Sequence, residues 1–412
     1  MGLYKYKPEP SGSMGALWAL ASLRDAAVLE FGLMGHMVDA RIALEKSGLG
    51  GRTASLYSTH IDDIDITMGG IDRISDALNN ISADPSIKAV FLLPSAVPEI
   101  IGTDFAALAE ELGPQYPQFD LIELGFSGLT TDVNQGVRGT LSALVKHLPR
   151  DIAKDSAPTF NIIGSCFDFL RFYADAAEMS RIMTGAFGMK PRCILTSDTL
   201  VEDIKSMGAA HINLVLRKEG LEAAQTLQSR FGTPFLPGRP YGLKATMDWI
   251  GKVSEITGIK PDKTFVDGEY KELDFFYDVF QKLYRRSKFY GRTEIRLSAA
   301  AHSDMVQGLA ACADELNFER HCFWCTNPDG GTADIPYLSE AEWEKLVPEI
   351  KNDILMASGD VLALAGKQQQ NILFTLPHRM WNLCMYDAPF MGFRGGVNLV
   401  SIWLREMQNV SG

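Results

Sequence analysis

The sequence predicts an α/β protein made of about three Rossmann-like units, with any functional site in the crevices between them. Three observations predict this class. The chain has 412 residues, and domains of roughly 100–200 residues then give two to three domains. Hydrophobic residues make up 46% of the chain and charged residues 22%, so each domain can bury a core. Short apolar runs also alternate with longer helical patterns along the chain.

The apolar runs are the expected strands. Each is short, is bounded by Gly, Pro, Asn or Asp, and is separated from the next by helical patterns such as those of residues 71–82 and 105–112. This is the βαβ pattern of buried parallel strands. The expected strands are Val90–Leu93 and Leu121–Leu124, then Asn161–Ile163, Cys193–Thr196 and Ile212–Leu216, and then Ile295–Ser298, His321–Cys325, Ile354–Ala357 and Ile372–Leu376.

Two polar segments mark the expected domain boundaries. Residues 149–158 are polar and bounded by prolines, and residues 282–292 form a basic run that precedes a new strand. Such segments are typical of linkers. We therefore expect three Rossmann-like domains, with the C-terminal segment packing back on the first. The expected ranges are 1–150, 151–285 and 286–412, with 385–412 as the returning segment.

The composition narrows the class of function. The net charge is −12, whereas a nucleic-acid binder needs a basic face. No apolar stretch reaches the ~18 residues that a membrane span needs, and the N-terminus lacks the apolar core of a signal peptide. The six cysteines are spread along the chain, unlike those of a secreted disulfide framework. We therefore expect a reduced, cytoplasmic protein that binds neither nucleic acid nor membranes.

Two turns near the N-terminus carry candidate chemistry. They are residues 31–37 (FGLMGHM) and 58–70 (STHIDDIDITMGG). His36, His60 and the carboxylates of Asp62, Asp63 and Asp65 could ligate a metal or transfer protons. The alternatives are that Asp62 and Asp63 cap a helix and that His36 has a structural or interface role. The chain has no Walker A loop, no GxGxxG after a strand and no HExxH, so it does not resemble a nucleotide enzyme.

A CxxC pair lies in the run His321–Cys325. A lone CxxC is a weak indication of a metal or redox site without a second pair or a helix N-terminus. Because alternate side chains of a strand point to opposite faces, Cys322 and Cys325 would face opposite ways. We expect buried, inert cysteines.

The C-terminal region combines a proline turn with a glycine-rich turn and a helix start. Pro377, His378 and Arg379 come first, and residues 388–400 (APFMGFRGGVNLV) follow. A helix N-terminus of this kind can frame an anionic ligand, with Arg379 and Arg394 as the anion contacts. The alternative is a glycine-rich corner that lets helices pack closely.

Together these segments resemble the nitrogenase component 1 type oxidoreductases along nearly the whole chain. The similar segments are residues 15–37, 58–70, 95–105, 123–145, 160–164, 212–216, 377–381 and 390–400. The resemblance implies three Rossmann-like domains around a central crevice, as in the nitrogenase iron–molybdenum protein. It also implies a homodimer, or a heterotetramer with a paralogous subunit, and electrons from a separate ATP-dependent iron–sulfur reductase.

The resemblance also implies cofactor positions, and this chain departs from them. Family members hold an iron–sulfur cluster at a subunit interface with cysteine thiolates. At the family's cysteine positions this chain has His36 and Ala96, and the earliest such position falls near Pro10 or Ser11. We expect His36 to be the candidate metal ligand, near the interface with His60 and Asp62. An interfacial [4Fe-4S] cluster is not supported by cysteines of this chain.

The large catalytic cofactor of true nitrogenases requires one cysteine and one histidine. The corresponding positions are Leu216 and a site near Asn382, with Cys384 and His378 close by. We therefore do not expect dinitrogen reduction at such a cofactor. His378, Arg379, Cys384 and Arg394 remain the candidate ligand-binding residues of the crevice.

Three functions follow as hypotheses. The first is a subunit of a nitrogenase-like oxidoreductase complex whose substrate is unknown, a tetrapyrrole being one option. The second is a non-catalytic scaffold or carrier for a metallocofactor or tetrapyrrole, because the thiolates are missing. The third is a cytoplasmic sensor with a fold like that of periplasmic binding proteins.

Overall fold

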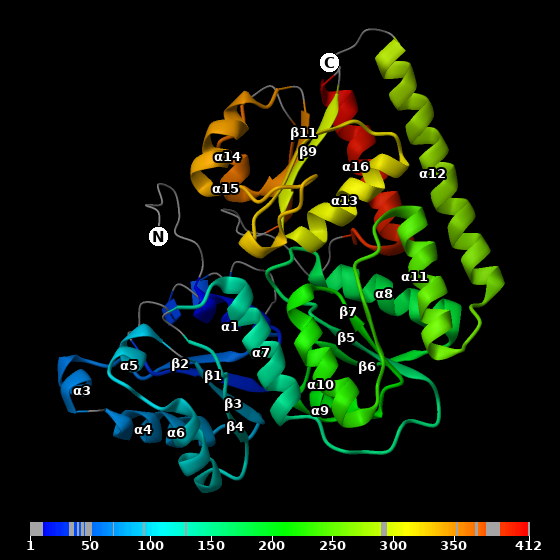
Figure 1. Cartoon of the computed structure of the whole chain (residues 1–412). Helices are drawn as coiled ribbons and strands as arrows, with labels where there is room; N and C mark the ends of the chain where they lie inside the picture. Colours follow the sequence, from blue (N-terminus) through cyan, green and yellow to red (C-terminus); the bar gives the residue numbers. More distant parts are fainter. Residues whose placement is uncertain are drawn as a thin grey trace.

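The structure is a computed structural model. It describes residues 11–32, 37–38, 41–42, 45, 52–68, 70–93, 95–127, 130–289, 295–351, 353–366, 370–375 and 388–410. These residues form three four-stranded sheets, and all of the strand pairs within them are parallel. Figure 1 shows the first and second sheets side by side and the third above them. The predicted class of three parallel α/β units is confirmed.

The first unit holds the strands and helices of the N-terminal third. Strand β1 is buried along its whole length, and α4 buries Ile74, Leu78 and Ile81 on one face, as its three- and four-residue spacing predicts. Its strands are β1 (Ala26–Glu30), β2 (Ser55–Ser58), β3 (Ala89–Leu93) and β4 (Asp120–Glu123). Its helices are α1 (Gly12–Leu20), α3 (Asp63–Met68), α4 (Ile71–Ser82), α5 (Ala96–Ile100), α6 (Phe105–Leu112) and α7 (Val133–His147).

The second unit begins after the polar segment 149–158. Its strands are β5 (Thr159–Ile163), β6 (Lys190–Leu195), β7 (Ile212–Val215) and β8 (Phe235–Pro237). Its helices are α8 (Phe172–Phe187), α9 (Val201–Lys205), α10 (Leu221–Phe231), α11 (Gly242–Thr257) and α12 (Lys263–Phe289). A short 3₁₀ turn, Lys218–Gly220, follows β7.

Helix α12 corrects the linker prediction for residues 282–292. Residues Lys282 to Phe289 are the last turns of this helix, which Figure 1 shows running along one side of the molecule up to the third unit. The physical reason is a buried stripe that a linker would not have. Its buried side chains are Val266, Leu273, Tyr277, Phe280 and Tyr284.

The third unit holds the remaining elements. Its strands are β9 (Arg296–Ala301), β10 (Arg320–Cys325), β11 (Asp353–Ser358) and β12 (Gln370–Thr375). Its helices are α13 (Ser303–Glu315), α14 (Glu340–Leu346), α15 (Gly359–Leu362) and α16 (Gly392–Val410). Helix α16 packs against α8, α11 and α12 and against β11 and β12, rather than on the first sheet as expected for the segment 385–412.

The three sheets repeat one strand order. The orders are β2-β1-β3-β4, β6-β5-β7-β8 and β10-β9-β11-β12. In each, the chain leaves the first strand toward one side of the sheet and the third strand toward the other. Ligand crevices of open α/β sheets form at this switch point, outside the carboxyl ends of those two strands. Crevices are therefore expected at the loops after β1 and β3, after β5 and β7, and after β9 and β11.

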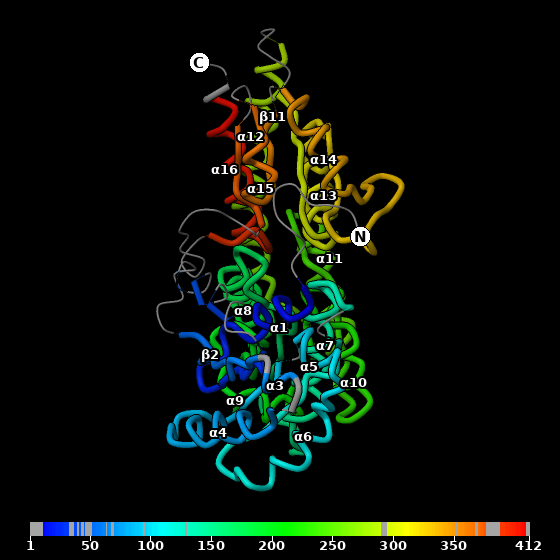
Figure 2. Tube along the Cα trace, turned by 90° about the vertical axis from the view of Figure 1, so that its left-hand side faces the viewer, coloured from blue at the N-terminus to red at the C-terminus, as the bar shows by residue number. Residues whose placement is uncertain are grey.

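The third unit is again uppermost when the molecule is turned by 90° (Figure 2), so the two views agree that it lies beyond the other two units along the long axis. None of the described helices combines the length and the apolar character that crossing a bilayer requires.

Candidate functional site

The residues that follow β5, β7 and β9 meet in the crevice between the second and third units. Residues 164–168 follow β5, Arg217 and Glu219 follow β7, and His302 follows β9. All three strands are parallel members of their sheets and end at the crevice, so their terminal loops converge there. Three charged side chains in these loops are buried: Asp168, Arg217 and Glu219.

Arg217 is the centre of this cluster. Its side chain is fully buried. Its Nε donates to Glu219 Oε2 at 2.8 Å, and its Nη1 donates to Asp168 Oδ1 and Oδ2 at 2.7 and 2.9 Å. Burying a charge is costly unless it is paired and hydrogen-bonded, and these two carboxylates supply that pairing.

A glycine and a phenylalanine hold the guanidinium in place. Gly164 has φ +86°, and a Cβ on it would lie 2.5 Å from Arg217 Cγ. The ring centre of Phe169 lies 4.3 Å from Arg217 Cζ, a distance at which a cation is attracted to the ring face. Both the path and the plane of the Arg217 side chain are therefore fixed by its neighbours.

One nitrogen of Arg217 is left over. Nη2 is buried and has no hydrogen-bond partner among the described residues. Cys166 lies close to the guanidinium, but burial raises the pKa of its thiol to about 12 even though the charge of Arg217 opposes this shift. The thiol is therefore not an anionic partner for the free nitrogen at neutral pH.

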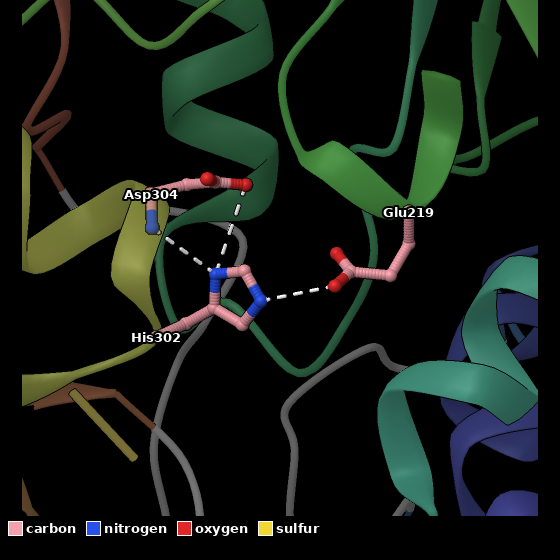
Figure 3. A group of neighbouring side chains, drawn as sticks. All are labelled: Glu219, His302 and Asp304. Atoms are coloured by element: carbon pink, nitrogen blue, oxygen red, sulfur yellow. Dashed lines mark hydrogen bonds and ion pairs between the residues drawn. The ribbon is translucent and has the colours of Figure 1, made fainter. Parts of the chain in front are cut away.

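His302 joins the third unit to the Arg217 cluster. Its Nδ1 accepts the backbone N–H of Asp304 at 3.3 Å, so the ring proton is on Nε2, which donates to Glu219 Oε1 at 3.1 Å. Figure 3 shows the imidazole between the two carboxylates, with one nitrogen facing Asp304 and the other facing Glu219. Asp304 Oδ2 lies 3.7 Å from Nδ1.

The same three residues are a geometric candidate for a metal site, but their arrangement is that of a hydrogen-bonded chain. Glu219 and Asp304 lie at opposite nitrogens of the ring (Figure 3), so the imidazole bridges the two carboxylates in this structure. Burial would raise the pKa of Glu219, but the Arg217 charge and the His302 hydrogen bond hold that pKa well below its ordinary value. Glu219 is therefore an anion that fixes both Arg217 and His302.

A pocket of about 460 Å³ opens beside this cluster. This volume lies within the ~300–1,000 Å³ range of ligand sites. The wall includes Arg217, Lys218 and Arg239 from the second unit and Asp304 and Gln307 from α13. The Lys218 backbone N–H donates to Asp304 Oδ2 at 2.7 Å, and its ammonium pairs with Asp329 at 2.5 Å. The pocket is thus formed by both units.

Arg239, also on this wall, has all its nitrogens occupied. Its Nη2 pairs with Asp175, its Nη1 donates to the Leu216 carbonyl and its Nε donates to the Tyr241 hydroxyl. Asp175 also accepts the backbone N–H groups of Phe390 and Met391. Arg239 therefore anchors the chain just before α16 rather than facing a ligand.

Arg394 lies in the first turn of α16, where the sequence predicted an anion contact. Its backbone N–H donates to Glu178 Oε1 at 3.1 Å, and its exposed side chain lies 4.0 Å from the same carboxylate. The N-terminal region of α16 thus receives carboxylates from α8 of the same chain.

His60 and Asp62, predicted near an interface site, lie on the rim of the first unit. Asp62 Oδ1 accepts the N–H groups of Ile64 and Asp65, which confirms the helix-capping alternative for Asp62. Arg73 donates to the His60 carbonyl and to Asp62 Oδ2, and pairs with Asp65. The acidic group is therefore neutralised by a cation of the chain itself.

The thiolate positions of the family do not fit a cluster in this chain. The first cysteine of the whole sequence is Cys166. Ser11 caps α1 through the N–H of Met14, and Ala96 is the first residue of α5. Ser95 beside it donates to the Phe31 carbonyl at 2.7 Å. The described residues of this rim offer hydroxyls already used in local bonds, and we derive no step through a cluster held by them.

The CxxC pair behaves as expected. Cys322 is half-buried and Cys325 is buried, and they pack in different hydrophobic clusters, as the opposite faces of a strand require. Burial raises the pKa of both thiols. Two inert thiols result.

Four of the predicted site residues lie outside the described residues: His36, His378, Arg379 and Cys384. Asn382 also lies outside them. Leu216, the expected position of a cofactor cysteine, is buried, and its carbonyl accepts from Arg239.

The sequence-based reasoning missed Arg217, Glu219 and His302. A signal was present, because the charged run Arg217–Glu219 directly follows the apolar strand Ile212–Val215. Charges just beyond a buried strand are placed at the carboxyl edge of a parallel sheet, where ligand sites form. His302 likewise directly follows β9.

Comparisons with known proteins agree with this architecture. A nitrogenase structure, "Nitrogenase Cp1 at pH 6.5", superposes with a TM-score of 0.80 at 17% identity, covering 100% of this chain and 93% of that one. The cofactor biosynthesis protein NifN of Nostoc sp. is 20% identical over 95% of this chain and 90% of its own. NifE of Clostridium pasteurianum is 25% identical over 54% of this chain and 49% of its own.

Tetrapyrrole-related proteins match a shorter part. A subunit of the light-independent protochlorophyllide reductase of Roseobacter denitrificans is 27% identical over 175 residues, 42% of this chain and 33% of that protein. The match therefore spans about a third of that relative's length. The family model described as nitrogenase component 1 type oxidoreductase matches residues 11–408. This chain therefore belongs to the nitrogenase component 1 type oxidoreductase family.

Proposed function

We propose that this chain is a subunit of a nitrogenase-like oxidoreductase complex that pairs with a paralogous subunit. In this proposal the complex receives electrons from an ATP-dependent iron–sulfur reductase. The crevice between the second and third units then serves as a substrate site, with a tetrapyrrole as the substrate class that the names of the protochlorophyllide relatives suggest.

The proposal rests on a contrast between the charged pocket and the positions of the cysteines. The chain keeps a buried, charged pocket at the switch-point edge of its second sheet, while no cysteine precedes Cys166. Thiolates are the usual ligands of iron–sulfur clusters. A paralogue that supplies them makes this chain the partner that contributes binding groups rather than cluster ligands.

The crevice residues supply chemistry that a reduction needs. Adding electrons to an unsaturated substrate also consumes protons, and Asp304 lines the pocket beside the His302 imidazole. In this proposal the Asp304 carboxyl group takes up a proton from solvent in the pocket and passes it to the substrate, while His302 Nδ1 accepts the Asp304 backbone N–H and so positions this residue. Glu219 in turn accepts from His302 Nε2 and fixes the orientation of the ring.

The test is anaerobic purification of this chain alone, of the paralogue alone, and of the two together. We expect iron and acid-labile sulfide in the preparations that contain the paralogue, and none in this chain alone. Reductase- and ATP-dependent turnover should require all three proteins. His302→Ala should lower kcat at least tenfold while the complex still assembles, whereas His147→Ala, a change on α7 remote from the crevice, should leave kcat unchanged.

Two results would overturn the proposal. One is a stoichiometric iron–sulfur cluster in this chain purified without a partner. The other is the absence of iron from every combination of the proteins.

A non-catalytic carrier or scaffold for a metallocofactor or tetrapyrrole is the second candidate. The observation that favours it is that NifN, whose name denotes cofactor biosynthesis, matches 95% of this chain, whereas the Roseobacter reductase protein matches 42%. A coloured complex that binds its ligand stoichiometrically but shows no reductase-dependent turnover would support the carrier and exclude the enzyme subunit.

A further inference from the structure

We infer that the outer face of helix α12 binds a second copy of this chain, with the two α12 helices packed antiparallel about a twofold axis. The inference goes beyond the proposed function, because it concerns the contact of this chain with itself rather than the crevice or the paralogue. Its support lies in a second apolar stripe on the helix, in the exposure of that stripe and in the distribution of charge along the helix.

Helix α12 has apolar side chains on two opposite faces. The inner face, which includes Leu273 and Tyr277, is buried, and the helix packs against α8, α11 and α16. Phe275, Val279 and Leu283 form a second stripe, because a spacing of four residues keeps side chains on one side of a helix. Phe275 is two residues from both Leu273 and Tyr277, which is more than half of a helical turn of about 3.6 residues. This outer stripe therefore begins on the side away from the core.

The outer stripe is accessible. Phe275 is 63% exposed and Leu283 is 43% exposed, and Val279 is partly exposed. Figure 1 shows α12 along the outside of the molecule. The Phe275 ring packs edge-on against Phe276, with the ring centres 5.8 Å apart, so it is already held in place. A surface helix normally carries polar residues on its outer face, and an exposed apolar stripe marks a site of interaction.

The charge of α12 changes sign along its length. Residues 267–278 contain five acidic side chains and one lysine, whereas residues 282–288 contain four basic side chains and no acidic one. Two parallel copies would place like charges beside each other. Two antiparallel copies place the acidic half of each helix beside the basic half of the other, which is favourable. The charge distribution therefore fits the same helix in the reverse direction.

A twofold axis at Val279 gives the register of the two copies. Residues equally far from Val279 then lie opposite each other. Phe275 of each copy packs on Leu283 of the other, and Glu272 lies near Arg286. Such a contact is isologous, so every pair occurs twice. The apolar stripe becomes the centre of the interface and the charged side chains form its rim, as in other protein–protein contacts.

The test uses the isolated full-length chain, without paralogue or reductase. Sedimentation velocity over a range of micromolar concentrations should show a reversible equilibrium between monomer and dimer. Phe275→Glu places a charge in the centre of the contact, and we expect dimerisation to weaken by at least about tenfold. Because Phe275 is mostly exposed, the thermal unfolding midpoint of the monomer should stay unchanged. Ile100→Glu is the matched control, since Ile100 is 68% exposed but lies on the first unit, and it should leave dimerisation unchanged.

An exchange of charges tests the antiparallel register. Glu272→Arg alone and Arg286→Glu alone each place like charges opposite each other, and each should weaken dimerisation by about threefold or more. The chain that carries both substitutions should regain the affinity of the unchanged protein, because each new arginine then faces a new glutamate. Added salt should weaken the unchanged dimer, since these charges are exposed.

A chain that stays monomeric over this range would overturn the inference, as would a dimer that Ile100→Glu disrupts and Phe275→Glu does not. Failure of the double exchange to restore affinity would overturn the antiparallel register. The paralogue is the other possible occupant of the outer stripe. Loss of the paralogue from the co-purified complex in Phe275→Glu would assign the stripe to the paralogue and overturn the contact between copies.

These outcomes are distinct from failure of the proposed function. A chain that dimerises through α12 but supports no turnover with paralogue and reductase would overturn the proposed enzyme role alone. Turnover by a complex whose chain does not dimerise would overturn the present inference alone.

Discussion

The rim of the first unit and the crevice of the second unit occupy the same place in the same topology. Both lie beyond the carboxyl ends of the first and third strands of a sheet with the order 2-1-3-4. On the first rim, the buried contacts between the loops are neutral, since Ser95 donates to the Phe31 carbonyl and Thr59 accepts the Gly32 N–H. The ion pairs of this rim, between Arg73 and the carboxylates of Asp62 and Asp65, are partly exposed. In the second crevice, a buried arginine and two carboxylates hold the loops.

The two regions also differ in what they present to solvent. Beside the first rim, Ile64 and Ile100 are 71% and 68% exposed, whereas Arg217 and Glu219 are fully buried. The comparison teaches that the fold fixes where loops converge and that the residues in the loops fix the chemistry. The first rim exposes apolar side chains, whereas the second crevice holds buried, paired charges.

Arg217→Met should have the largest effect. It leaves Asp168 and Glu219 buried beside an apolar side chain, and removal of one partner from a buried ion pair costs about 3–5 kcal/mol. Urea unfolding should show this loss of unfolding free energy. Arg192→Met is the control in the same sheet, since that pair is partly exposed and should cost about 0–1 kcal/mol. Equal losses in the two variants would contradict the contrast between buried and exposed pairs.

Glu219→Gln should change the pH dependence of stability. The folded-state pKa of Glu219 lies below its ordinary value of 4.5, so its contribution is present above about pH 4.5 and is lost as the pH falls. One such group changes the unfolding free energy by up to about 1.4 kcal/mol per pH unit. The unfolding free energy is measured between pH 3 and pH 7, a range that brackets the ordinary pKa of a carboxyl group at roughly 4. It should fall less steeply toward acid pH in the variant than in the unchanged protein. Parallel curves for the two proteins would refute this assignment.

Gly136→Ala probes the first unit. A Cβ on Gly136 would lie 1.9 Å from the Gly12 carbonyl oxygen, where α7 crosses α1. Overpacking of this kind costs about 1–3 kcal/mol, measured as a lower thermal midpoint. Gly251→Ala on α11 is the matched control, because nothing lies within 4 Å of its Cβ position. The control should stabilise the protein by about 0.5–1 kcal/mol.

Ser95→Ala should have the smallest effect. It removes one neutral hydrogen bond to the Phe31 carbonyl, which contributes about 0.5–1.5 kcal/mol. If Ser95→Ala lost more unfolding free energy than Arg217→Met, the first rim would contribute more to stability than the second crevice, which would contradict the comparison.

Much of the fold could be predicted, since the apolar runs have local causes. Val90–Leu93 and Ile212–Leu216 lie within a residue of β3 and β7. Strand β1 was missed because its run Ala26–Glu30 continues a helical pattern, and β8 because it has three residues and ends in Pro237. The end of helix α12 was predicted as a linker because residues 282–292 form a basic run, while the burial of Tyr284 becomes evident only against the third unit.

The site was less predictable. Asp62 could be assigned as a helix cap because capping is local, within three residues. Arg217, Asp168 and His302 are separated by 49 residues or more along the chain, so no spacing rule connects them. Their partners are set by strand order, which one sequence does not reveal.

By itself, the sequence determined the class of fold, the family resemblance and the lack of cysteine in the first unit, since these depend on residue identity and local periodicity. Only the tertiary structure decided that Arg217 is buried with one nitrogen unpaired among the described residues and that His302 lies between two carboxylates. The physical reason is that the ends of separate strands meet only in the folded chain. Whether a buried charge is paired depends on which groups those strand ends bring next to it.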